Sequence, residues 1–227
     1  MARAVTDPRA QLIGSIAERI ARTCDDLVLR GGLLTHLWVP QRAVRDLDYV
    51  GDYAFDLAAT RDRVARALPD EDIRAEGIWL DTPFPGVRIR AGEHIAIDVG
   101  FGDPLVPEPT RVTIGATSAR CVRPETQLAW KLHSLAEMQA SFRPKDVADL
   151  WLLARYVMMT PELISRAIPP AFTSRGFALE TARVLEAPYW ATKTARVRWE
   201  PYRARIGELA DVLATVRDVL REPLEGL

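Results

Sequence analysis

The spacing of apolar positions changes along the chain, and this spacing predicts the elements. Between residues 8 and 23, Leu12, Ile13, Ile16 and Ile20 recur three or four positions apart, which predicts an amphipathic helix. Shorter apolar runs follow, separated by glycine, proline and acidic residues, as is typical of strands and their turns. Strands are expected over 27–30, 45–50, 73–80, 87–90, 94–99 and 111–117.

Helical spacing occurs at two places between these strands and then throughout the second part of the chain. One helix is expected after the glycine pair at 31–32 and another over 57–68. From Pro124 onwards the pattern is helical throughout, and the proline pair at 169–170 is expected to separate two helices. The helices expected in this second part are 125–140, 145–157, 161–167, 177–185 and 201–220.

This change of pattern predicts an α+β fold, with an α/β domain and mixed sheet over residues 1–120 and a helical domain over 121–227. A chain of 227 residues, of which 48% are hydrophobic, can form one large core or two small ones. The formal net charge of −1 gives no global pull toward nucleic acid or an anionic membrane. Any contact with nucleic acid must therefore come from a local patch.

Nothing in the sequence directs the chain to a membrane or a secretory route. The first residues lack the apolar core of a signal peptide, and no apolar run is long enough to span a bilayer. The two cysteines, Cys24 and Cys121, show no metal-ligand spacing and no disulfide pattern. We therefore expect a cytoplasmic protein that does not bind membranes.

Two aspartates flank a leucine in the predicted strand 45–50. Alternation along a strand puts Asp46 and Asp48 on one face and turns Leu47 toward a core. Neighbouring carboxylates repel each other unless a cation lies between them, and Mg²⁺ prefers carboxylate and phosphate oxygens. The pair therefore suggests metal-assisted phosphoryl chemistry, although the solvated face of an edge strand would give the same pattern.

A third acid, Asp98, is the only charge within an alternating apolar strand. Burial of a lone carboxylate is costly unless it is paired or bound to a metal. If Asp98 approaches Asp46 and Asp48, three carboxylates could hold two Mg²⁺ ions about 3.5–4 Å apart. Alternatively, Asp98 is a strand-end residue bonded to a turn amide, and the pattern by itself favours neither explanation.

Glycine and lysine positions point to phosphate binding. Gly31 and Gly32 allow close approach of the backbone to a phosphate, and the following helix offers free N–H groups, although a glycine pair is also a simple tight turn. Lysine occurs only at Lys131, Lys145 and Lys193, while arginine supplies the other basic residues. A lysine in such a chain can act as a compact point charge on a phosphate.

Five segments follow in order between residues 25 and 155, at 27–34, 42–48, 97–103, 124–132 and 143–150. Together they resemble motifs of the AbiEii/AbiGii toxin family, within the DNA polymerase β-like nucleotidyltransferase fold. Two positions depart from the family pattern, because Val44 stands where many members have Ser or Thr, and Gly32 replaces the Ser of the wider superfamily's Gly-Ser. Backbone amides would then carry the phosphate contact of the missing hydroxyl.

The resemblance implies a polymerase β-like nucleotidyltransferase α/β domain followed by a C-terminal helical domain. It implies transfer of an NMP from an NTP to an acceptor hydroxyl with Mg²⁺, or Mn²⁺ as an alternative, held by Asp46, Asp48 and Asp98. It also implies the toxin half of a toxin–antitoxin or phage-defence pair, with an antitoxin protein as partner and tRNA or a protein as acceptor. The alternative is a non-catalytic module on the same fold that binds an NTP or a partner.

The remaining catalytic roles also come from the resemblance. Lys131 is expected to contact the triphosphate. Asp146 either orients Lys131 or the acceptor, or caps its own helix, and Asp149 is expected to be structural. Arg30 and Arg42 are expected either to contact nucleotide phosphates or to pair with the acids. The expected nucleotide contacts are Arg30, Gly31, Gly32, Arg42 and Lys131.

Other polar and aromatic residues are expected to be structural. The basic, aromatic segment 196–205 could grip RNA, but a solvated helix start with Trp199 docked inward is favoured. The histidines show no metal-ligand spacing, and the other helical tryptophans fall on apolar faces. These residues are His36, His94, His133, Trp38, Trp130 and Trp151.

Overall fold

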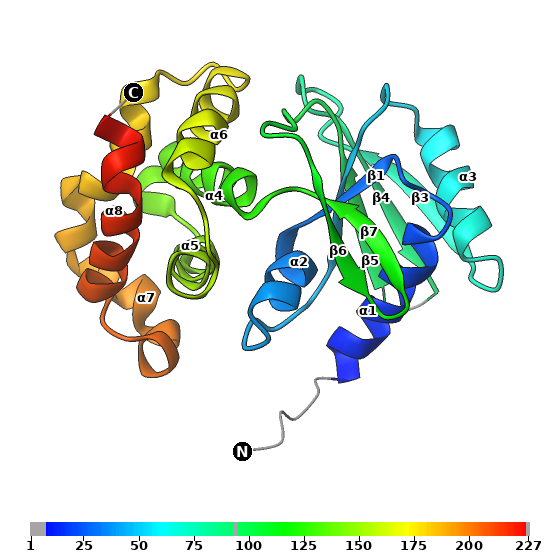
Figure 1. The fold of residues 1–227 in the computed structure, drawn as a ribbon, viewed down its shortest axis with the longest axis horizontal. Helices are drawn as coiled ribbons and strands as arrows, with labels where there is room; N and C mark the ends of the chain where they lie inside the picture. The colour runs from blue at the N-terminus through cyan, green and yellow to red at the C-terminus, as the bar shows by residue number, and fades with distance from the viewer. Residues whose placement is uncertain (1–7, 93–94, 226–227) are drawn as a thin grey trace. The chain divides into compact units, whose positions relative to one another are not determined.

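The computed structural model describes residues 8–92 and 95–225, so the predicted role of His94 lies outside the described residues. The chain divides into two compact units (Figure 1). Unit 1 takes in the chain up to Asp103 together with Glu108–Val122, and unit 2 takes in Pro104–Pro107 and everything from Arg123 onwards. Each unit is described by itself below.

Unit 1 is built on a seven-stranded sheet with the strand order β3-β4-β5-β2-β1-β7-β6. Strand β2 pairs with β5 in parallel, as does β1 with β7, and the other neighbours are antiparallel. The mixed sheet of the predicted α+β fold is thereby confirmed. The strands are β1 Leu27–Arg30, β2 Leu47–Gly51, β3 Ile73–Ile78, β4 Gly86–Ala91, β5 Ile95–Gly100, β6 Thr110–Ile114 and β7 Thr117–Cys121.

Three helices accompany this sheet. Helix α1 buries Ile13, Ile16 and Ile20, which are three of the four apolar positions that predicted it, whereas the fourth, Leu12, is exposed. Asp56 caps the start of helix α3, where its side chain accepts a hydrogen bond of 2.9 Å from the backbone N–H of Ala59. The helices are α1 Pro8–Ala21, α2 Gly31–Trp38 and α3 Leu57–Ala67.

The single strand predicted over 111–117 is wrong, because the chain forms the hairpin β6–β7 there. Ile114 lies opposite Thr117, so the turn between them is tight. Gly115 has a φ of +57°, a conformation that residues with a Cβ rarely adopt. The prediction treated the apolar residues on both sides of Gly115 as one strand, although the chain reverses direction at this glycine.

Unit 2 is helical. Three of its helices begin with a proline at the first turn, where a missing N–H costs no hydrogen bond. No helix among the described residues is both long enough and apolar enough to cross a membrane. The elements are α4 Pro124–Met138, α5 Pro144–Tyr156, α6 Pro161–Thr173, α7 Lys193–Ile206 and α8 Leu209–Glu225, with the 3₁₀ segments η1 Gln139–Ser141, η2 Leu179–Glu186 and η3 Pro188–Ala191.

Two predicted helix boundaries in unit 2 are wrong. The helix expected over 201–220 is two helices, because Gly207 has a φ of +127° and ends α7. The proline pair at 169–170 does not separate helices, since α6 continues through it to Thr173. The Thr173 hydroxyl donates to the Pro169 carbonyl at 2.9 Å within that last turn.

Candidate functional site

Four charged residues form one row across four neighbouring strands of unit 1. Arg30 of β1 lies opposite Asp48 of β2, and Asp48 lies beside Asp98 of β5. Asp98 in turn lies opposite Arg88 of β4. Because residues paired across neighbouring strands share a face, all four side chains leave the sheet on the same side, in the order cation, anion, anion, cation.

Asp46 and Asp48 both lie against the first turn of α2. A Cβ added to Gly31 would stand 2.1 Å from Oδ2 of Asp48, and one added to Gly32 would stand 3.7 Å from Oδ1 of Asp46. Strand β2 begins at Leu47, which is buried, so Asp46 directly precedes the strand that was predicted to contain it. The two carboxylates are therefore gathered at one helix N-terminus, where free N–H groups favour negative charge.

Asp98 is held by a partner that the sequence pattern did not mark. Nε of Arg88 donates to Oδ1 of Asp98 at 2.8 Å, and Nη2 donates to Oδ2 at 2.7 Å. The Asp98 carboxylate raises the pKa of Arg88, with smaller contributions from Glu76 and Asp46. The sequence pattern gave no signal for Arg88, because its pairing with Asp98 depends on the register between β4 and β5.

The three acids fit a divalent cation only in part. Asp46 and Asp48 offer the hard oxygen donors of which Mg²⁺ usually takes one or two, with phosphates supplying others. Both oxygens of Asp98 are bonded to Arg88 instead. Within residues 8–92 and 95–225, no three His, Cys, Asp or Glu side chains are arranged to hold a metal ion. The three-carboxylate metal site therefore stays a prediction.

The two arginines expected near the nucleotide differ in their contacts. Nη1 of Arg30 donates to Oδ2 of Asp103 at 2.8 Å, so Arg30 has an acidic partner from the end of the third-acid motif. Arg42 lies near the glycine pair, with Nη2 3.6 Å from a Cβ added to Gly32. Arg42 also donates to the carbonyl of Ala43. Phosphate contacts by either arginine stay predictions.

In unit 2, Lys131 of α4 is bonded to two acids of α5. Its Nζ lies 2.6 Å from Oδ1 of Asp146 and 3.1 Å from Oδ2 of Asp149. Three residues apart on a helix, the two aspartates share one face, and both are fully buried. Oδ2 of Asp146 also accepts from Nε of Arg143 at 2.7 Å and from the Ser134 hydroxyl at 3.2 Å.

These contacts keep the buried charges ionised. Burial disfavours the charged form of Lys131, but Asp149 and Asp146 together outweigh it and hold the pKa of Lys131 above its usual value. Burial likewise opposes ionisation of Asp146, yet Lys131 and Arg143 hold its pKa below the usual value. Asp146 and Asp149 thus orient Lys131, and the predicted contact of Lys131 with a triphosphate stays a prediction.

The structure places the other predicted residues mostly in packing roles. Trp199 is buried, as favoured, and its indole N–H donates to the Gly207 carbonyl at 2.8 Å. His133 is buried with its ring edge-on to Phe172 and Phe177. Nδ1 of His36 lies 2.7 Å from the Arg42 carbonyl.

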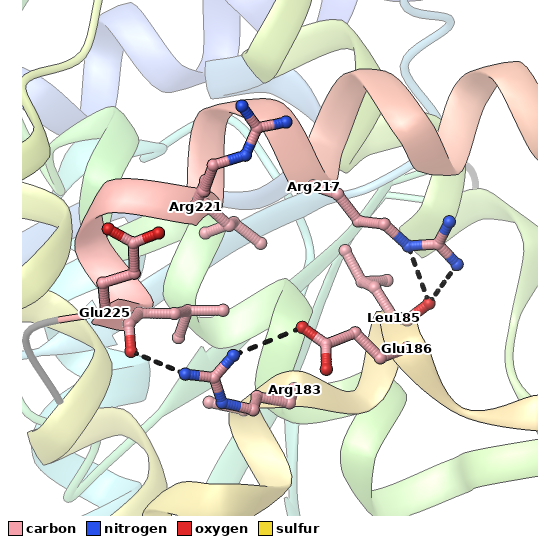
Figure 2. Close-up of a pocket in the computed structure, with 9 residues that line it drawn as sticks. Arg183, Leu185, Glu186, Arg217, Arg221 and Glu225 are labelled. Carbon is pink, nitrogen blue, oxygen red and sulfur yellow. Dashed lines mark hydrogen bonds and ion pairs between the residues drawn. The ribbon is translucent and has the colours of Figure 1, made fainter.

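A pocket of about 260 Å³ lies between η2 and α8, away from the predicted catalytic residues of unit 2, none of which lines it (Figure 2). Nε of Arg217 donates to the Leu185 carbonyl at 3.0 Å. Arg183 donates to the Leu224 carbonyl at 3.1 Å and pairs with Glu186 at 3.4 Å. These arginines tie α8 to η2, and the sequence did not predict this pocket.

Solved structures of nucleotidyltransferases share this fold. A protein from H. pylori described as a nucleotidyltransferase superposes with a TM-score of 0.54 at 16% identity, with 97% of each chain covered. An antigenic nucleotidyltransferase-like protein from Paracoccidioides brasiliensis gives 0.51 at 17% identity, with 89% of this chain and 92% of the other covered. The fold is therefore of the nucleotidyltransferase class.

The family assignment is more specific. The family model described as nucleotidyl transferase AbiEii toxin, type IV toxin–antitoxin system, matches residues 18–221. The chain belongs to this family, and the resemblance seen in the sequence motifs is confirmed. It is accordingly a nucleotidyltransferase. A search of curated proteins returned no match.

Proposed function

We propose that this protein transfers an NMP from an NTP to an acceptor hydroxyl and releases pyrophosphate, with Mg²⁺ as the metal and Mn²⁺ as an alternative. The observation that carries the proposal is the placement of Asp46 and Asp48 together against the first turn of α2, which begins with two glycines. A bound divalent cation would stabilise the charge that develops on the phosphoryl oxygens.

Each residue of the proposed site has a role that follows from its chemistry. Asp46 and Asp48 would hold the metal ions through hard oxygen donors. Backbone N–H groups at Gly31 and Gly32 would bind the triphosphate, because glycine keeps the approach to the helix N-terminus open. Asp98, in the same row as Asp48, would add a third ligand and assist removal of the acceptor proton.

Lys131 is assigned the neutralisation of charge on the leaving pyrophosphate. Its two aspartate partners favour the ammonium form and limit its rotamers, so that it would present a fixed positive charge. Arg30 and Arg42 are proposed as further phosphate contacts. Asp146 is proposed to act through Lys131, which it orients.

The acceptor and the partner follow from the family. We propose that the protein acts in the cytoplasm, that its acceptor is a tRNA or a protein, and that an antitoxin protein counteracts it. The family's description as a type IV toxin supports the antitoxin. No part of the proposal involves a membrane.

Asparagine at Asp46 or Asp48 should abolish activity, because an amide is a far weaker ligand for a hard cation than a carboxylate. Purified protein would be incubated with each labelled NTP, Mg²⁺, and either total RNA or cell protein, and incorporated label counted. We expect a loss of at least roughly 10³-fold in each variant.

The matched control is Asp52→Asn, an acid just after β2 that pairs with Arg120 at 2.6 Å. It should retain near-normal incorporation. Full activity in both Asp46→Asn and Asp48→Asn would reject the proposed site. NTP binding without incorporation into any acceptor would instead favour the non-catalytic alternative.

A further inference from the structure

Arg88 pairs with Asp98, the third acid of the proposed site, through both carboxylate oxygens. The guanidinium fork uses both carboxylate oxygens of Asp98, with distances of 2.8 and 2.7 Å. The Asp98 side chain is only 17% exposed, so few of its lone pairs remain available to another ligand. A hard cation would therefore compete with Arg88 for the same two oxygens of Asp98.

The carboxylates around Arg88 favour a positive charge at its position. Asp48 and Asp98 are neighbours in one row, and Asp46 lies against the same helix turn as Asp48. Carboxylates gathered in this way repel one another unless positive charge lies among them. A guanidinium suits this position, because it stays charged at every physiological pH and matches a carboxylate geometrically.

The Arg88 side chain is partly exposed and has a second acidic neighbour. Its side chain is 36% exposed, about twice as much as that of Asp98. On its other side, the row continues to Glu76 of β3, which lies directly opposite Arg88 and is 59% exposed. The guanidinium can therefore leave Asp98 without becoming buried and unpaired.

We propose that Arg88 is a positioning residue that occupies Asp98 in the metal-free protein and is displaced from it when a divalent cation binds. This inference rests on the proposed function, because it assumes that the acids bind a metal. Arg88 competes with the cation for Asp98, and so it sets the metal concentration at which the three-carboxylate site assembles. In the metal-free state it also stabilises the fold by neutralising the carboxylates.

The test is calorimetric titration of the full-length protein with Mn²⁺ alone, without nucleotide. Arg88→Gln should bind Mn²⁺ roughly tenfold more tightly than the unchanged protein, as expected for removal of a unit charge near a divalent ion under near-aqueous screening. The matched control is Arg90→Gln, since Arg90 has the same charge on the same face of β4 but pairs only loosely with Glu76, at 3.9 Å. Its Mn²⁺ affinity should stay within about twofold of the unchanged protein.

A second measurement is the melting temperature in EDTA. Arg88→Gln should melt below the unchanged protein in EDTA and gain more from added Mn²⁺, because binding to the folded state alone stabilises it. If the glutamine variant does not fold, Arg88→Lys serves instead. The ammonium of this lysine cannot form the two parallel hydrogen bonds that a guanidinium makes with a carboxylate. The Mn²⁺ affinity of Arg88→Lys should therefore exceed that of the unchanged protein.

The outcomes separate the two proposals. If the unchanged protein binds Mn²⁺ and Arg88→Gln binds it no more tightly, competition by Arg88 is refuted while the proposed function stands. If neither protein binds Mn²⁺ and Asp48→Asn retains transfer activity, both proposals fail. Tighter binding by Arg88→Gln with unchanged Arg90→Gln supports the inference.

Discussion

At the scale of the residue, Gly31 shows how a backbone conformation and a neighbouring side chain together exclude any other amino acid. Gly31 has a φ of +75°, which strains a residue with a Cβ. Space forbids one as well, since a Cβ would stand 2.1 Å from Oδ2 of Asp48. The residue therefore permits both the start of α2 and the position of the Asp48 carboxylate.

Gly31→Ala should lower the free energy of unfolding by about 2 kcal/mol, because of backbone strain and the displacement of Asp48. Urea denaturation measures this change, and nucleotide incorporation should fall with it. The control is Gly14→Ala in α1, where nothing lies within 4 Å of an added Cβ. This substitution should stabilise the protein by roughly 0.5–1 kcal/mol, and a Gly31→Ala variant that matches it would contradict the argument.

At the scale of the element, α4 and α5 are joined by buried ions as well as by apolar packing. Lys131 on α4 bonds to Asp146 and Asp149 on α5, and Arg143 adds a second cation. The charges of these four residues cancel. A buried cluster of this kind tolerates change at its members poorly, because removal of one partner leaves the others uncompensated.

Acid should destabilise this helix pair through Asp146. Its pKa in the folded protein lies below the usual 3.8, so its contribution to stability is present above about pH 4 and is lost as the pH falls through the folded pKa. Asp146→Asn should lower the free energy of unfolding at pH 7 by about 3 kcal/mol and flatten its fall between about pH 4 and 2.

Thermal denaturation from pH 2 to pH 7 measures both effects. Glu137→Gln is the control, since Glu137 is an exposed acid on the same helix as Lys131. Its acid profile should match that of the unchanged protein. An Asp146→Asn profile that falls as steeply as the control's would show that other carboxylates govern the acid transition.

At the scale of the whole molecule, each of the two units has its own core. Ile97 of β5 is fully buried in unit 1, and Leu213 of α8 is 2% exposed in unit 2. We expect a core truncation to weaken mainly the unit that contains it, because proteins open locally in cooperative units that follow compact parts of the structure.

Leu213→Ala should cost about 2–4 kcal/mol through lost burial and a residual cavity. Amide hydrogen exchange should then show the loss of protection chiefly in α4–α8, and Ile97→Ala should show it chiefly in β1–β7. Equal loss across all elements in both variants would mean that the two units unfold as one.

Local pattern predicted much of this architecture. The apolar spacing of α1 and the proline starts of α4, α5 and α6 are properties of single segments, so their elements could be predicted without knowledge of the partners. The order of five motifs likewise identified the family. Two errors fell at Gly115 and Gly207, where one glycine reverses or ends an element whose apolar pattern continues. A third fell at the proline pair 169–170, through which α6 continues.

The sequence by itself determined the order of the five motifs, the apolar spacing of α1 and the proline starts of α4, α5 and α6, because these follow from chemistry within a few residues. Only the tertiary structure decided that Arg88 lies opposite Asp98 and that Asp146 and Asp149 share Lys131. Such pairings depend on strand register and on which helix faces meet. Packing between distant segments determines the strand register and the helix faces that meet. Apolar spacing along the chain does not predict this packing.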